Sequence, residues 1–105
     1  MSEFRVVFCT IDTIERAKQL AHELVKNRLA ACVNIISRGT SIYEWKGEIV
    51  EDNEFLLIIK TKATLYSKLE AKIKELHPYE VPEIVSLNLE EGSKDYLDWI
   101  KDNTL

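Results

Sequence analysis

Apolar residues follow two different periods along this chain, one typical of strands and one typical of helices. Four extended stretches are rich in β-branched and aromatic residues, and we predict that each forms a strand: residues 4–10, 31–45, 49–62 and 83–89. Three other stretches carry apolar residues at helical spacing: residues 12–27, residues 64–77 and a short segment after Gly92 and Ser93. Asp12 and Glu15 have the spacing of a capping box, which predicts that the first helix begins there.

The two central strands are predicted to be unusually long. A turn at Lys46–Gly47 joins residues 31–45 to residues 49–62, and both segments far exceed the usual strand length of about 5–6 residues. Gly39 interrupts the first of them, where it permits a β-bulge or a sharp bend. These features predict a long hairpin arm.

The order of the predicted elements is strand, helix, strand, strand, helix, strand, helix, which matches the split βαβ arrangement. We therefore predict an α+β fold, a ferredoxin-like split βαβ sandwich with an extended hairpin and an extra C-terminal helix. Its four-stranded antiparallel sheet has the order 4-1-3-2, and two helices cover one face. The length of 105 residues predicts a single domain over residues 1–105.

The second face of the predicted sheet is apolar as well. Residues 55–59 are apolar at five consecutive positions, although strand side chains alternate between faces. The other residues expected on this uncovered face are Val6, Phe8, Val33, Ile35 and Ile42. Soluble monomers rarely keep such a surface. Another copy of the same chain would cover it, so we expect a closed homo-oligomer in which the hairpin arm reaches a neighbour.

Composition and charge narrow the functional classes. The charged fraction is 30% and the formal net charge is −4, which indicates a soluble acidic protein and disfavours nucleic acid and anionic membranes as partners. No apolar run approaches the roughly 20 residues that cross a bilayer, and no signal-peptide pattern is visible, so we expect a cytoplasmic location. We do not expect an enzyme, because neither a nucleophile–base pair nor an anion-binding loop is visible.

Both prolines of the chain lie in one connector, residues 77–84, with the sequence HPYEVPEI. Pro78 ends the preceding helix at His77, and Pro82 is tolerated at the start of a strand. The predicted sheet order puts this connector near Cys9, and a thiolate with an imidazole suits Cu(I), Cu(II) or Zn(II). Two structural interpretations are equally open. Cys9 can be a small buried hydrophobe, and His77 can interact with the helix dipole.

Five motifs carry a resemblance to a known family: VFCT at residues 7–10, RLAACVN at 28–34, SIYEWKG at 41–47, KT at 60–61 and HPYEVPEI at 77–84. Along its whole length the chain resembles the CutA family, the divalent-cation tolerance proteins. The resemblance implies a homotrimer of ferredoxin-like subunits, similar in architecture to the PII signalling trimers. It also implies a link to copper and other divalent cations.

The resemblance further implies a metal site at Cys9 and His77. Leu76 stands where some relatives carry a second histidine, so this chain lacks one ligand, and Glu80 is a possible additional one. Two protein ligands are fewer than the three or four of a dedicated site. Copper, as Cu(II) or Cu(I), or another divalent cation is therefore expected to bind weakly, and the protein is expected to fold without it.

Four other features are expected to be structural. Tyr43 and Trp45 at the hairpin tip are expected to be trimer contacts, because aromatic residues are enriched in interface cores. Cys32 is expected in the core, too far from Cys9 for a disulfide within one subunit. Its alternatives are an intersubunit thiol or a second soft-metal contact. The acidic run at residues 51–54 is expected to be a solvated strand edge that discourages wrong pairing, and its alternative is a site for a hard cation.

A rival function shares the same fold and assembly. It is a PII-like signalling or binding trimer that holds a small anion or metabolite at intersubunit clefts, near Lys60, Tyr79 and Glu83. The sequence leaves this function and metal binding both open. Metal content of the purified protein would distinguish them.

Overall fold

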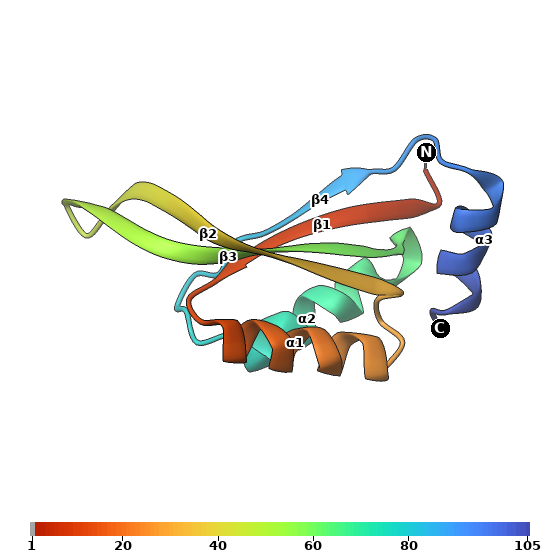
Figure 1. Ribbon diagram of the computed structural model, residues 1–105, viewed down its shortest axis with the longest axis horizontal. Coiled ribbons are helices and arrows are strands. Elements are labelled where there is room, and N and C mark those ends of the chain that lie inside the picture. The colour runs from red at the N-terminus through yellow and green to blue at the C-terminus, as the bar shows by residue number, and fades with distance from the viewer. Residues whose placement is uncertain (1) are drawn as a thin grey trace.

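The sheet and its helices have the arrangement that the sequence predicts. The computed structural model describes residues 2–105, with these elements in order: β1 (Phe4–Ile11), α1 (Ile14–Lys26), β2 (Cys32–Trp45), β3 (Glu48–Lys62), the 3₁₀ turn η1 (Ala63–Leu65), α2 (Tyr66–Leu76), β4 (Ile84–Asn88) and α3 (Lys94–Asp102). The four strands form an antiparallel sheet in the order β2-β3-β1-β4. Figure 1 shows α1 and α2 on one face of this sheet and α3 at the end near both termini. The α+β, ferredoxin-like fold is confirmed.

The helices begin and end at residues with identifiable caps. The predicted capping box at Asp12 is wrong by one position, because Thr13 is the extended residue whose hydroxyl accepts a hydrogen bond from the Arg16 N–H. Asp12 instead pairs with the Arg16 guanidinium at 2.6 Å. Ser93 caps α3 in the same way as Thr13 caps α1. Within residues 2–105, none of the helices is long and apolar enough to cross a membrane.

The long hairpin is confirmed and projects well past the helices (Figure 1). Its turn residues Lys46 and Gly47 have φ angles of 51° and 85°, the left-handed conformation that tight hairpin turns require. The predicted bulge is present as a shift of register between Ile36 and Gly39. The molecule therefore measures 45 × 25 × 23 Å, with the arm along its longest axis.

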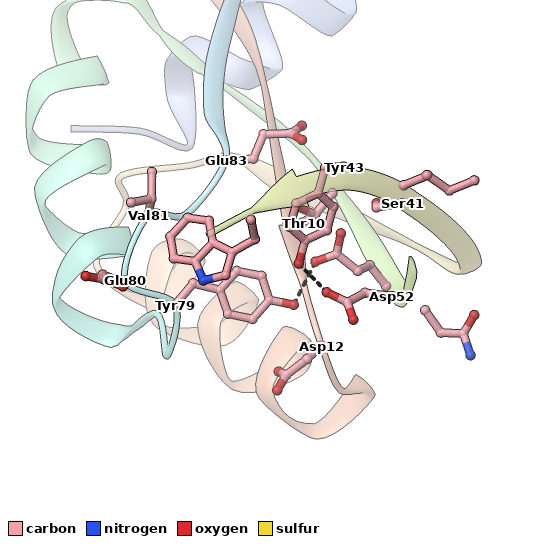
Figure 2. Close-up of a pocket in the computed structure, with 13 residues that line it drawn as sticks. Thr10, Asp12, Ser41, Tyr43, Asp52, Tyr79, Glu80, Val81 and Glu83 are labelled. Carbon is pink, nitrogen blue, oxygen red and sulfur yellow. Dashed lines mark hydrogen bonds between the residues drawn. The ribbon is translucent and has the colours of Figure 1, made fainter. Parts of the chain in front are cut away.

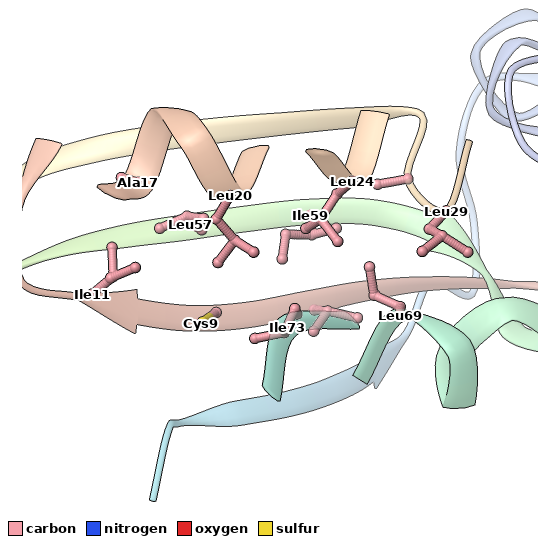
Figure 3. Packing of buried hydrophobic residues seen from close by; sticks show 12 residues of the cluster. Cys9, Ile11, Ala17, Leu20, Leu24, Leu29, Leu57, Ile59, Leu69 and Ile73 are labelled. Atoms are coloured by element: carbon pink, nitrogen blue, oxygen red, sulfur yellow. The ribbon is translucent and has the colours of Figure 1, made fainter. Parts of the chain in front are cut away.

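The face of the sheet toward the helices holds the main core (Figure 3). Buried residues of β1 and β3 meet those of α1 and α2, and the set includes Val7, Cys9, Ile11, Leu57, Ile59, Leu20, Leu24, Leu69 and Ile73. Val33 and Ile35 also pack against this cluster. Their expected place on the uncovered face is wrong, because they pair with Ile59 and Leu57 and so share the helix-facing side.

The opposite face, called the open face below, is apolar and has no helix packed over its centre (Figure 1). Strand register assigns seven apolar residues to it: Val6, Phe8, Ile36, Leu56, Ile58, Val85 and Leu87. Ile36, Val85 and Leu87 are each about half exposed, and the others are partly exposed. The expected place of Ile42 on this face is wrong, because the bulge shifts the register and pairs Ile42 with Glu51, which lies on the other side of β3 from Leu56 and Ile58. The prediction of an apolar second face is confirmed.

Candidate functional site

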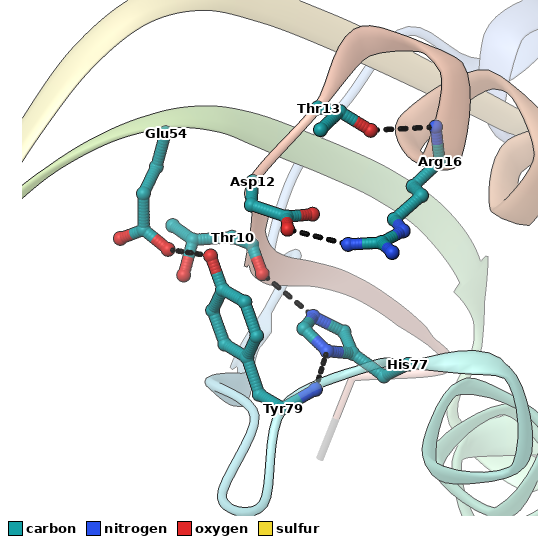
Figure 4. A network of polar contacts seen from close by, with 7 residues as sticks. All are labelled: Thr10, Asp12, Thr13, Arg16, Glu54, His77 and Tyr79. Carbon is teal, nitrogen blue, oxygen red and sulfur yellow. Dashed lines mark hydrogen bonds and ion pairs between the residues drawn. The ribbon is translucent and has the colours of Figure 1, made fainter.

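His77 anchors the connector to the end of β1 (Figure 4). Its ring Nε2 lies 2.7 Å from the Thr10 carbonyl oxygen, and its Nδ1 accepts a hydrogen bond from the Tyr79 N–H at 3.1 Å. Because Nδ1 accepts, the proton of the neutral ring must be on Nε2, which donates to Thr10. The connector therefore lies against the end of β1, as the sheet order predicts.

Cys9 lies on the helix-facing side of β1 and is fully buried. Burial raises the pKa of its thiol from 9.0 to about 12, and the negative charges of Glu83 and Glu54 add to this effect. The thiol therefore keeps its proton at neutral pH. In this environment Cys9 packs as a small apolar side chain.

As folded, Cys9 and His77 do not form a ready-made metal site. A metal ligand must be a thiolate or an imidazole nitrogen with a free lone pair, but this thiol is protonated and both ring nitrogens have partners. Among residues 2–105, no group of three or more His, Cys, Asp or Glu side chains is placed to hold a metal ion. Copper binding by this pair stays a prediction that requires a local rearrangement.

Cys32 differs from its expected place in the core. It pairs with Lys60 on β3 and is partly exposed on the open-face side. Its Sγ lies 3.9 Å from the Asn34 Oδ1 atom. Both cysteines are free thiols. They lie on opposite sides of β3, because Cys9 of β1 pairs with Leu57 whereas Cys32 of β2 pairs with Lys60. Exposure leaves Cys32 available to a neighbouring subunit, which was the alternative interpretation.

A cleft of about 870 Å³ opens beside the connector, between the hairpin arm and the end of β1 (Figure 2). We call it the acidic cleft, because five carboxylates line it: Asp12, Asp52, Glu54, Glu80 and Glu83. Three aromatic side chains complete its walls: Tyr43, Trp45 and Tyr79. Among the side chains that the structure describes, none that lines the cleft is a lysine, arginine or histidine. The cleft therefore has a strongly negative interior with aromatic walls.

Glu54 is the most buried carboxylate of the acidic cleft, with 6% of its surface exposed. Its Oε2 accepts a hydrogen bond of 2.7 Å from the Tyr79 hydroxyl (Figure 4). Burial and the charge of Glu54 raise the pKa of Tyr79, and Asp12 and Asp52 contribute in the same direction. Tyr43 in turn donates a hydrogen bond to the Asp52 carboxylate.

This cleft was not predicted from the sequence. Residues 51–54 were expected to be a solvated edge, but Glu54 is buried, because its side chain faces the connector and accepts a hydrogen bond from Tyr79. One signal was available: Glu54 is in phase with Leu56 and Ile58 along an otherwise apolar strand face. Trp45 was expected only as a trimer contact, and within one subunit it lines the same cleft as Tyr79.

Comparison with known proteins identifies relatives over nearly the whole chain. Residues 5–103 match the family "CutA1 divalent ion tolerance protein". The Thermus thermophilus "Divalent-cation tolerance protein CutA" is 52% identical over 99 residues, which are 94% of this chain and 96% of that protein. Human "Protein CutA" is 46% identical over 97 residues, 92% of this chain but only 54% of the human protein. The chain thus spans about half the length of several curated relatives that it matches.

Solved structures agree with the sequence comparison. The divalent cation tolerance protein from Thermus thermophilus superimposes with a TM-score of 0.94 at 51% identity, over 97% of this chain and 99% of that one. CutA1 from Oryza sativa gives a TM-score of 0.96 at 39% identity, over 99% of this chain and 95% of that one. The whole described fold is therefore shared with these proteins.

Proposed function

This chain belongs to the CutA1 family of divalent ion tolerance proteins, and we propose that it acts as a homotrimer that binds divalent cations. The Thermus thermophilus relative is named as a divalent-cation tolerance protein rather than as an enzyme. We propose no catalytic activity for this chain, and we propose the cytoplasm as its location.

The open face is the observation that carries the proposed trimer. It leaves Ile36 of β2 and Val85 and Leu87 of β4 about half exposed, so that the apolar surface reaches both edges of the sheet. Water contact with such a surface is unfavourable by about 25 cal/mol per Å² of apolar area. A ring of three copies would cover every open face at once, and closed symmetry leaves no further copy to add. The number three is the one that the family resemblance implies.

The hairpin arm supplies the proposed intersubunit contacts. Ile42 and Ile49 are largely exposed on the arm, and Tyr43 and Trp45 are more than a third exposed. The arm projects past the helices, so its outer end has few other parts of the same chain around it (Figure 1). We propose that Tyr43 and Trp45 contact the neighbouring subunit.

Copper or another divalent cation is proposed to bind weakly, with Cys9 and His77 as ligands and Glu80 as a possible additional one. Support comes from the hydrogen bond of His77 to Thr10, the residue that follows Cys9. Binding must remove a proton from a thiol whose pKa is about 12 and break a hydrogen bond of the imidazole ring. Both requirements lower the affinity of Cys9 and His77 for copper or another divalent cation.

Calorimetric titration with Cu(II), and with Cu(I) under reducing conditions, tests the copper proposal. Cys9→Ser and His77→Ala should each abolish the main isotherm, and Cys32→Ser is the matched control that should keep it. If only Cys32→Ser lost the isotherm, the copper site would lie at the other end of the sheet, and the proposal for Cys9 and His77 would be wrong.

The acidic cleft favours a second candidate function, a trimer that holds a small ligand. Its volume of about 870 Å³ is in the range of small-molecule sites, roughly 300–1,000 Å³. Its described lining does not favour the small anion considered from the sequence, because five carboxylates and no described cationic side chain line it. The Lys60 ammonium is not one of the lining groups and donates to Asn34 instead.

A further inference from the structure

The projecting part of the hairpin arm, residues 39–54, leaves the body of the sheet at Glu54. β1 pairs with β3 as far as Phe55, which lies opposite Ile11. Within the described part of the chain, β3 pairs only with β2 from Glu54 to the turn. The register shift of β2 lies at the same level, because it ends at Gly39, the partner of Glu54. A β-bulge bends its strand and increases the local twist, so the direction of the arm is decided at this level.

Glu54 and Tyr79 attach the base of the arm to the connector. The Tyr79 hydroxyl donates to Glu54 Oε2 at 2.7 Å (Figure 4). Among the described side chains, this is the one hydrogen bond that joins residues 39–54 to the rest of the molecule. The bond between Tyr43 and Asp52 lies within the arm. Glu54 is also the most buried of the described arm residues, with 6% of its surface exposed.

Tyr79 is itself held from the side of the sheet. Its backbone N–H donates to His77 Nδ1 at 3.1 Å, and His77 Nε2 donates to the Thr10 carbonyl oxygen at 2.7 Å. The rings of His77 and Tyr79 meet edge to face, with their centroids 4.6 Å apart. A continuous series of contacts therefore runs from the end of β1 through the connector to the base of the arm.

We propose that the hydrogen bond between Tyr79 and Glu54 is a latch that fixes the direction of the hairpin arm and so presents the arm to a neighbouring subunit. The inference rests on the proposed trimer and names what prepares the arm for that contact. A segment that is already held in its bound direction loses less conformational freedom when it docks, and this strengthens the association. Tyr79 is thus a positioning residue for assembly.

Tyr79→Phe tests the latch, because it removes the hydroxyl and keeps the ring. Hydrogen–deuterium exchange of the full chain, read by mass spectrometry, should be faster in residues 39–54 than in the parent, whereas α1 should keep its rate. A general loss of stability would accelerate exchange in both segments. Sedimentation velocity over a dilution series should show a rise of about tenfold or more in the dissociation constant of the trimer.

Tyr66→Phe is the matched control. The Tyr66 hydroxyl donates to Glu70 Oε1 at 2.9 Å within α2, so this variant loses the same kind of bond away from the arm. It should change neither the exchange of residues 39–54 nor the dissociation constant.

Variants of Glu54 test whether the hydrogen bond itself is responsible. Glu54→Gln keeps an oxygen acceptor for Tyr79 and should stay close to the parent in both measurements, whereas Glu54→Ala should behave like Tyr79→Phe. Combining Glu54→Ala with Tyr79→Phe should add little to either single change, because both remove the same bond. Equal effects of Glu54→Gln and Glu54→Ala would overturn the latch, because the charge of Glu54 would then be responsible.

Unchanged exchange of residues 39–54 in Tyr79→Phe would also overturn the latch, and so would an equal effect of Tyr66→Phe. Light scattering on the parent keeps the two proposals apart. A monomeric parent would contradict the proposed trimer, while the exchange measurement would still decide whether Tyr79 holds the arm. A trimeric parent whose Tyr79→Phe variant has faster arm exchange but an unchanged dissociation constant would overturn the role of the latch in assembly.

Discussion

Leu87→Ala should weaken the proposed trimer by an amount that can be worked out from the structure. Leu87 lies on the open face opposite Val6, and 52% of it is exposed in the isolated subunit. Full burial of a leucine contributes about 1.5–3 kcal/mol, so covering the exposed half contributes about 1 kcal/mol per subunit. The substitution in all three subunits should therefore reduce the free energy of trimer association by about 3 kcal/mol, which corresponds to about a 100-fold increase in the dissociation constant.

Sedimentation velocity over a dilution series measures this change. Leu76→Ala is the matched control, because Leu76 is 40% exposed but lies at the end of α2, across the sheet from the open face. It should leave the dissociation constant unchanged. The reasoning is refuted if Leu87→Ala dissociates at the same concentration as the parent, or if Leu76→Ala weakens the trimer equally.

Two further predictions concern the arm and the core. Trp45→Ala should weaken assembly in the same dilution series, because Trp45 is proposed to contact a neighbour; an unchanged dissociation constant would make it a surface residue. The raised pKa of Cys9 means that its uncharged thiol contributes stability below pH 9, and this contribution is lost as the pH rises from 9.0 toward about 12. Urea unfolding between pH 8 and 11 should therefore show a smaller loss of stability for Cys9→Ala than for the parent, and equal losses would contradict the assigned environment.

Much of the fold could be predicted because it depends on local periods and on turn chemistry. Residues 55–59 are all apolar, and because strand side chains alternate between faces, this run indicated a sheet with two apolar faces. The Lys46–Gly47 turn indicated the hairpin. The helix cap was predicted wrongly, because two adjacent residues can both act as caps and only the folded geometry decides between them. Thr13 rather than Asp12 caps α1, because only its hydroxyl meets the Arg16 N–H.

The site was predicted less well than the fold. The sheet order correctly brought His77 to the end of β1, but it did not reveal that both ring nitrogens would have partners. The acidic cleft brings Tyr43 and Glu54 of the hairpin together with Asp12 after β1 and Tyr79 of the connector, and their convergence depends on the path of the arm. No local pattern in the sequence contains that information.

The molar mass of the unmodified chain in solution tests the proposed trimer most directly. Light scattering coupled to gel filtration should give three times the chain mass of 12.2 kDa, and this value should persist on dilution. Exposing three open faces is unfavourable, so the parent should dissociate only at concentrations far below those that light scattering covers. A stable folded species of 12.2 kDa would contradict the account, because the open face would then remain in water without a partner.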